Sequence, residues 1–107
     1  MSHITYTRLL NDGLKLYQAG KFWEGYEMMT RNCMHEPRND AQMYDFRASL
    51  ACRAGLSDLG GSLLSEAVME KGCWYTQEYL AGDDDIRPAA QLPGFQRLMK
   101  KIVEIWN

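Results

Sequence analysis

The spacing of apolar residues in the first third of the sequence predicts two short helices. From residue 5 to 19 the apolar side chains recur every three or four positions, which places them on one stripe of a helix. Gly20 follows, and glycine readily adopts the positive φ at which many helices end. A second stripe with the same spacing runs from residue 22 to 33, and Pro37 closes it. We therefore expect a helical hairpin over residues 5–37.

The pattern then repeats. Shifting the sequence by 35 residues aligns Ala19-Gly20 with Ala54-Gly55 and Gly25 with Gly60, and helical periodicity coincides with this register. Asn39 or Asp40 can cap the first helix of the new unit, because both side chains accept hydrogen bonds from free backbone N–H groups. We expect a second helical hairpin over residues 39–72.

The remaining residues, 73–107, do not continue the hairpin pattern. A short helical stretch around residues 76–81 is followed by the acidic turn Asp83-Asp84-Asp85, which we expect to shape a loop rather than to bind calcium. Pro93-Gly94-Phe95 looks like the start of a final helix, since proline is tolerated in a helix's first turn. This tail should add a partial third unit closed by a C-terminal capping helix.

No segment favours a β-sheet. Sustained alternation of apolar and polar residues is absent, and the chain has only two valines and four isoleucines. The predicted fold class is all-α, with residues 1–107 forming a single domain.

Composition narrows the class of protein. The chain has 107 residues and a net charge of −2, so no basic field attracts nucleic acid, and no apolar run is long enough to span a membrane. The three cysteines form an odd set with long gaps, which is typical of free thiols. We expect a cytoplasmic protein that binds neither nucleic acid nor membranes.

The glycine pattern resembles that of the tetratricopeptide repeat. Gly13 and Ala48 lie where the first helix of each hairpin needs a small side chain, and Gly25 and Gly60 do the same in the second helix. The repeat of this family is about 34 residues long, and its small residues let two helices approach closely. The resemblance implies a tetratricopeptide-like array that acts as a binding scaffold and supplies no catalytic residue.

The tail resembles the closing segment that follows such repeats in many bacterial multidomain proteins. The resemblance includes Lys71-Gly72, Trp74-Tyr75 and the spacing of Pro88 and Pro93. In some of those proteins a hydrolase or a regulator domain comes next. This likeness implies an alternative function, namely a helical accessory region of a bacterial hydrolase or regulator whose catalytic part lies elsewhere.

A search for chemistry finds no complete site. Gly60-Gly61-Ser62 lies in a helical pattern and lacks the second glycine of a nucleophile elbow. Cys33 and His35 are two residues apart, and no other cysteine or histidine gives a standard metal-ligand spacing. We therefore expect no catalytic residue, no metal site and no cofactor. A thiol or metal sensor that uses the cysteines is a third, weaker hypothesis.

Aromatic residues could serve either the core or recognition, because large rings dominate both. The favoured role is core packing for Trp74, and the two roles are equally weighted for Trp23. The other candidates are Tyr75, Tyr79 and Trp106.

In a tetratricopeptide-like array the first helices line a concave groove. We expect this groove to bind another protein or a peptide, as a short helix or an extended segment, and a homodimer is also open. The chain would then be a non-catalytic interaction module. The predicted groove residues are Leu10, Leu14, Tyr17, Gln42, Asp45, Ser49 and Cys52.

Overall fold

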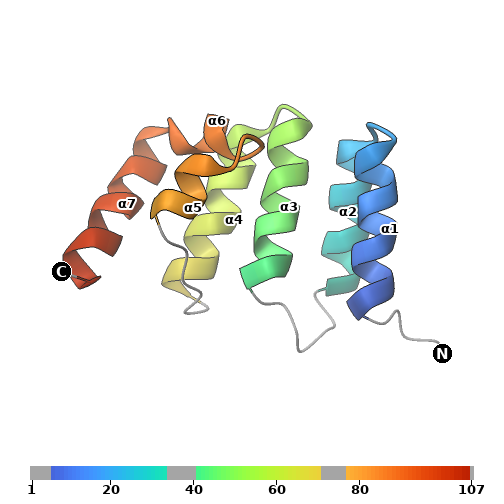
Figure 1. The fold of residues 1–107 in the computed structure, drawn as a ribbon, viewed down its shortest axis with the longest axis horizontal. Helices are drawn as coiled ribbons and strands as arrows, with labels where there is room; N and C mark the ends of the chain where they lie inside the picture. Colours follow the sequence, from blue (N-terminus) through green and yellow to red (C-terminus); the bar gives the residue numbers. More distant parts are fainter. Residues whose placement is uncertain (1–5, 34–40, 71–76, 107) are drawn as a thin grey trace.

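The computed structural model describes residues 6–33, 41–70 and 77–106, and in these ranges the chain is all-α with no strand. Figure 1 shows the helices following one another along the molecule. The helices are α1 (Tyr6–Gln18), α2 (Phe22–Cys33), α3 (Ala41–Arg53), α4 (Ser57–Met69), α5 (Gln77–Gly82), α6 (Arg87–Ala90) and α7 (Pro93–Trp106). The all-α prediction is confirmed for these ranges.

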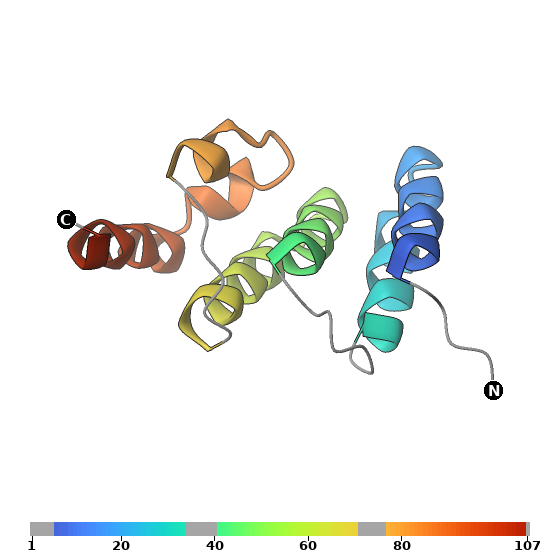
Figure 2. The same ribbon diagram turned by 60° about the horizontal axis from the view of Figure 1, so that its bottom comes forward.

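Helices α1 and α2 form one side-by-side pair, and α3 and α4 form the next (Figures 1 and 2). Each pair is joined by a tight turn in which the glycine has a positive φ, +76° at Gly20 and +86° at Gly55. In the first turn the Gly20 N–H donates to the Tyr17 carbonyl and the Lys21 N–H to the Leu16 carbonyl. These two bonds form a Schellman motif, which satisfies carbonyls left free at a helix end. The predicted glycine turns are confirmed.

Replacing Gly55 by alanine is expected to lower the free energy of unfolding by about 1–2 kcal/mol, because a side chain at positive φ collides with its own backbone. Urea denaturation measures the change. Gly82→Ala is the control, since Gly82 has no positive φ and an added Cβ would have no neighbour within 4 Å. Equal effects of the two substitutions would show that the positive φ of Gly55 is not the cause.

Small residues lie where helices cross, as the sequence predicts. A Cβ added to Gly13 in α1 would lie 2.5 Å from Sδ of Met29 in α2. A Cβ added to Gly25 in α2 would lie 3.1 Å from a methyl carbon of Leu50 in α3. The same geometry recurs at Gly60 in α4. These close approaches explain why glycine occurs in helix interiors despite its cost of roughly 1 kcal/mol relative to alanine.

Two apolar cores lie on different sides of α3. The first core joins α1, α2 and α3 and consists of Leu9, Met29, Met43 and Leu50. The second core joins α3 and α4 to the tail helices and consists of Tyr44, Ala48, Ala51, Leu63, Leu64, Ala67, Leu80, Ile86 and Phe95. Even Arg47 of α3 is 6% exposed, and its Nε donates to Oγ1 of Thr30 at 3.1 Å. Helix α3 is therefore packed on nearly all sides.

Residues of the tail pack against α4 in the second core. Leu80 from α5, Ile86 before α6 and Phe95 from α7 are all buried in the second core. The acidic turn is shaped by Asp83, whose Oδ1 accepts the backbone N–H of Asp85 at 2.9 Å. The predicted start of the last helix at Pro93 is confirmed, whereas α6 was not predicted. Cys33, Trp74 and Trp106 belong to predictions whose side chains lie outside the described part of the structure.

Candidate functional site

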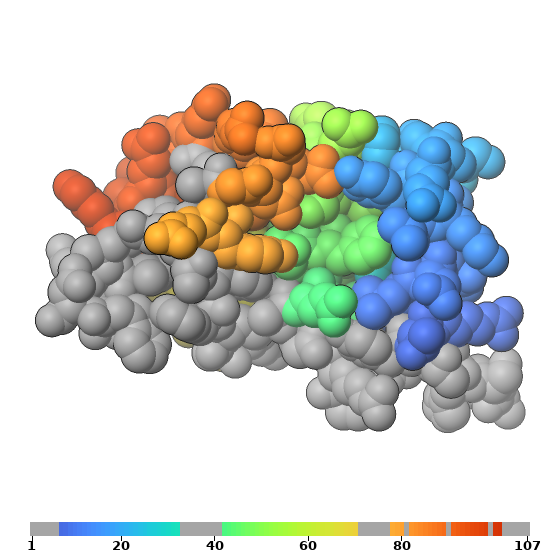
Figure 3. All heavy atoms as spheres, in the orientation of Figure 1, coloured from blue at the N-terminus to red at the C-terminus, as the bar shows by residue number. Residues whose placement is uncertain are grey.

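A groove opens where α1, α3, α5 and the turn after α5 meet. Its volume is about 280 Å³. Figure 3 shows the side chains of α5, in orange, beside those of α3, in green, and of α1, in blue. We call it the α1/α3/α5 groove, and its lining residues are Leu14, Tyr17, Gln42, Asp45, Phe46, Ser49, Tyr79 and Asp85. Five of the seven predicted groove residues are among them.

The other two predicted groove residues, Leu10 and Cys52, are not among the lining residues. Leu10 is half-buried and packs against the first core, one helical turn before Leu14. Cys52 is 7% exposed, and its sulfur is a near neighbour of Gly60 in α4, one helical turn beyond Ser49.

Two tyrosines hold two aspartates in the groove. Tyr17 donates its hydroxyl to Oδ2 of Asp85 at 2.6 Å, across 68 residues of sequence. Tyr79 donates its hydroxyl to Oδ2 of Asp45 at 2.5 Å. Each bond raises the pKa of its tyrosine, because the carboxylate stabilises the protonated hydroxyl and repels a phenolate. Both tyrosines therefore act as hydrogen-bond donors to the carboxylates.

Arg53, at the end of α3, anchors one side of this arrangement. Its Nε lies 3.8 Å from Oδ1 of Asp85, and its guanidinium carbon lies 4.9 Å from the ring centre of Phe22. The same guanidinium carbon lies 5.9 Å from the ring centre of Tyr17. An arginine over aromatic faces is attracted by their negative potential. These contacts tie the turn after α5 to the tip of the first helix pair.

Asp45 is the least satisfied polar group in the groove. Its Oδ1 is buried and has no hydrogen-bond partner, although its Oδ2 accepts from Tyr79. Burial raises the pKa of this carboxyl, and the nearby charges of Asp83 and Asp85 raise it further, while the bond from Tyr79 lowers it. A buried carboxylate oxygen without a donor destabilises a fold, which makes Asp45 a candidate for ligand contact.

The raised pKa of Asp45 predicts a pH-dependent stability. The folded protein holds this proton more tightly than the unfolded chain, so the Asp45 contribution is fully favourable below the unfolded value of 3.8. That contribution is lost as the pH rises through the folded pKa. We expect the stability of Asp45→Asn relative to the wild type to increase as the pH rises above 3.8, as measured by urea denaturation. An equal pH dependence in Asp58→Asn, which changes an exposed carboxylate of α4, would contradict this prediction.

Cys52 is chemically protected. Burial raises the pKa of its thiol to about 11, and the charges of Asp85 and Asp83 add to the effect, against a backbone hydrogen bond with Ala89. Alkylation requires the thiolate, so iodoacetamide at about pH 8 should modify Cys52 at least about a hundredfold more slowly in the folded than in the urea-unfolded chain. Peptide mass spectrometry measures the rate at this cysteine. Similar rates in the two states would contradict the prediction and favour a reactive thiol.

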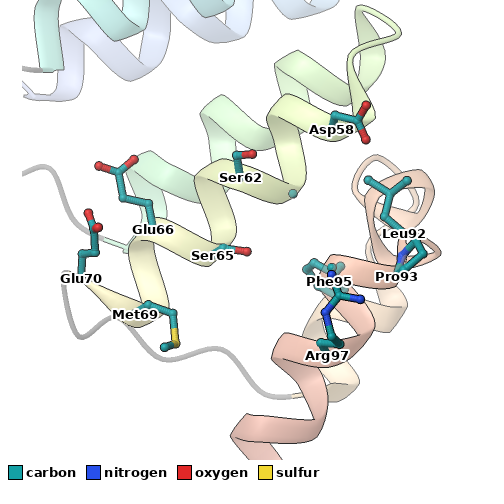
Figure 4. Close-up of a pocket in the computed structure, with 12 residues that line it drawn as sticks. Asp58, Ser62, Ser65, Glu66, Met69, Glu70, Leu92, Pro93, Phe95 and Arg97 are labelled. Carbon is teal, nitrogen blue, oxygen red and sulfur yellow. The ribbon is translucent and has the colours of Figure 1, made fainter.

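A second cavity, of about 740 Å³, opens between α4 and α7 (Figure 4). Ser65 and Met69 lie on the side of α4 that faces α7, and Phe95 and Arg97 lie opposite them on α7. The Met69 side chain is exposed, at 54%. We call this cavity the α4/α7 wedge, and its further lining residues are Asp58, Gly61, Ser62, Glu66, Glu70, Leu92, Pro93 and Gly94.

Three residues that line the groove were not among the predicted groove residues. Phe46 comes from α3, while Tyr79 and Asp85 come from the tail. The sequence contained a signal for the tail pair, because Tyr79 was a recognition candidate and Asp85 lies in the acidic turn. Nothing in the sequence indicated the contacts that bring Tyr79 and Asp85 beside α1 and α3.

Trp23, for which core and recognition were weighted equally, is exposed at 44%. Its ring stacks on Tyr26 with centres 5.3 Å apart. The side chain is therefore a surface aromatic of α2.

Two negative findings concern the described residues alone. Within residues 6–33, 41–70 and 77–106, no three His, Cys, Asp or Glu side chains are grouped so that they could hold a metal ion. None of the helices in these ranges has the length and apolarity needed to cross a membrane.

Comparisons with known proteins give the family. The model of the family described as "A/B hydrolase-like, N-terminal domain" matches residues 5–104. No curated protein matches the sequence significantly. The crystal structure of an uncharacterized protein from Bacillus cereus ATCC 10987 is similar, with 34% sequence identity and a TM-score of 0.82. That match covers 95% of this chain and 33% of the Bacillus chain, so this chain spans about a third of its relative. The helical domain described here belongs to the A/B hydrolase-like N-terminal domain family, and not to the tetratricopeptide repeats that its glycine pattern resembles.

Proposed function

We propose that the chain is a helical accessory domain of an α/β-hydrolase, which packs against the catalytic domain and shapes access to its active site. The observation that carries this proposal is the family match over residues 5–104. That family is described as an N-terminal domain of hydrolase-like proteins, which supports the proposal. The helical domain itself would take no part in bond breaking.

The coverage of the Bacillus relative supports this proposal. About two thirds of that chain lies outside the matched region, which leaves room for a catalytic domain of ordinary size. Ser62, the serine that follows two glycines, lies inside α4 and is exposed. A hydrolase nucleophile needs a sharp turn between a strand and a helix, so Ser62 lacks the required setting.

The α4/α7 wedge is the surface that we propose for the contact with the catalytic domain. Its α4 side carries small residues, Gly61, Ser62 and Ser65, which allow a neighbouring element to approach closely. Met69 is exposed beside them, and exposed apolar side chains around a cavity are typical of docking surfaces. The wedge has a volume of about 740 Å³.

The test begins with the reading frame that encodes the chain and with its neighbours, where we expect a hydrolase sequence with a Gly-x-Ser-x-Gly elbow. The hydrolase is then assayed on short-chain and long-chain p-nitrophenyl esters, with the helical domain present and removed. We expect removal to change the ratio of the two kcat/KM values by at least about tenfold. An unchanged ratio, or the absence of a hydrolase, would overturn the proposal.

Point variants locate the contact without removing the domain. Met69→Asp places a charge in the wedge, and Trp23→Asp makes the same kind of change at an exposed aromatic of α2. We expect the wedge variant alone to reproduce the shift in ester preference. If Trp23→Asp has the same effect, the wedge is not the contact surface.

A second candidate is a non-catalytic module that binds another protein or a peptide. The observation in its favour is the α1/α3/α5 groove, which gathers five residues predicted for such a role. The tetratricopeptide-like arrangement of the helix pairs, a homodimer and a cytoplasmic location stay predictions attached to this candidate. A chain with no hydrolase in or beside its reading frame would favour it.

A further inference from the structure

The α1/α3/α5 groove has the size of a pocket for one side chain. Its volume of about 280 Å³ lies just below the roughly 300–1,000 Å³ of pockets that enclose drug-sized ligands. Leu14, 43% exposed, and Tyr79, 48% exposed, are large apolar groups of the lining that remain open to solvent. An occupant that enters this groove would therefore be a single extended group, with the chain that carries it lying on the open side.

The charges of the groove are of one sign. Asp45 and Asp85 line it, and no lysine or arginine does. Asp83 acts on Asp45 from the same turn. Arg53 approaches Asp85, but its guanidinium also lies over the Phe22 ring and its side chain is 50% exposed. The groove thus favours a cationic occupant.

The aromatic side chains favour a planar cation. Tyr17, Phe46 and Tyr79 line the groove, and their rings can lie against a flat group. Guanidinium groups stack on aromatic faces and present several N–H donors in one plane, whereas an ammonium is a compact and strongly hydrated charge. Arg53 makes this kind of contact beside the groove, because its guanidinium lies over the Phe22 ring and near Asp85.

The groove also lacks one hydrogen-bond donor. Oδ1 of Asp45 is buried without a partner, while Oδ2 is occupied by Tyr79. A buried carboxylate oxygen of this kind gains most from a charged donor, because such bonds are roughly twice as strong as neutral ones. Tyr79 is the half-exposed group that has to move aside for the donor to reach Asp45.

We propose that the α1/α3/α5 groove is a binding site for an arginine side chain carried by a segment of a second polypeptide. Asp45 and Asp85 accept from the guanidinium, the rings of Tyr17 and Phe46 lie against it once Tyr79 has moved aside, and Leu14 contacts the segment beside the arginine. This inference goes beyond the proposed hydrolase-accessory function and does not depend on it, since it concerns a different surface from the α4/α7 wedge.

The test is a titration of the 107-residue chain followed by NMR of its backbone amides. The probes are acetyl-Ala-Arg-Ala-amide and the matched peptide with citrulline, which has the shape of arginine but no charge. We expect amide shifts at groove residues of α1, α3 and α5, with binding of the arginine peptide at least about tenfold tighter than that of the citrulline peptide. A lysine peptide should bind more weakly than the arginine peptide.

Variants assign the binding to the groove. Asp45→Asn should weaken the arginine peptide at least about tenfold, whereas Asp58→Asn, the same change in the α4/α7 wedge, should leave the affinity unaltered. Tyr79→Phe keeps the ring and releases Asp45, so it should bind as tightly as the wild type or more tightly. Equal affinity for the arginine and citrulline peptides, the absence of saturable binding, or amide shifts centred on the α4/α7 wedge would overturn the proposal. These experiments contain no hydrolase, so their failure leaves the accessory function untouched.

Discussion

Replacing Leu50 by alanine is expected to lower the free energy of unfolding by about 2–5 kcal/mol. Leu50 is fully buried in the first core, where it connects α3 to Leu9 of α1 and Met29 of α2. It also contacts the face of α2 at Gly25, so truncation would leave a cavity between two closely spaced helices. Equilibrium denaturation in urea, followed by circular dichroism at 222 nm, measures the loss.

The matched control for this prediction is Leu56→Ala. The same side-chain atoms are removed, but Leu56 is 41% exposed at the start of α4. Its loss should change the free energy of unfolding by less than about 1 kcal/mol. If the two alanine variants are equally destabilised, the first core does not hold the helix pairs together in the way described.

Gly60→Ala is expected to destabilise the protein by about 1–3 kcal/mol, even though alanine favours helices over glycine by roughly 1 kcal/mol. A Cβ at this position would collide with Sγ of Cys52 and would lie 3.2 Å from the backbone carbonyl oxygen of Ala48. The carbonyl belongs to α3 and cannot rotate away, so α4 has to move outward. Thermal and urea denaturation both report the effect.

The neighbouring glycine provides the control. A Cβ at Gly61 would meet only a methyl carbon of Leu92, at 3.7 Å, which is an ordinary van der Waals contact. Gly61→Ala should therefore be neutral or stabilise by up to about 1 kcal/mol. A destabilised Gly61→Ala, or an unaffected Gly60→Ala, would contradict the close crossing of α3 and α4.

Local signals were sufficient to predict the two helix pairs. The three-and-four spacing of apolar residues and the glycines at positions 20 and 55 act within a few residues, so the sequence around each turn determines its geometry. The small residues at positions 13, 25, 48 and 60 were also predictable, because glycine inside a helix requires a packing reason.

The burial of α3 was not predictable from one apolar stripe. Tyr44, Ala48 and Ala51 face the second core while Met43 and Leu50 face the first, so apolar residues cover most of the helix circumference. Periodicity detects a helix with one buried face and fails for a helix enclosed by neighbours.

Only the side of the groove that α1 and α3 form could be predicted from the sequence. Leu14, Tyr17, Gln42, Asp45 and Ser49 follow from which face of α1 and α3 is left by their partner helices. The other side depends on the tail, which reaches α1 through the bond from Tyr17 to Asp85 across 68 residues. Contacts between residues so far apart in the sequence produce no periodic pattern of apolar residues.

The enclosure of α3 by both cores has a consequence for how the molecule opens. Backbone amides in the middle of this helix can exchange with deuterium only when the two ends of the protein come apart together, so they should report global rather than local unfolding. Gln42, Asp45 and Ser49 lie on the same helix. An occupant of the groove would then slow deuterium uptake at the amides that exchange only by global unfolding, because binding raises the free energy of unfolding.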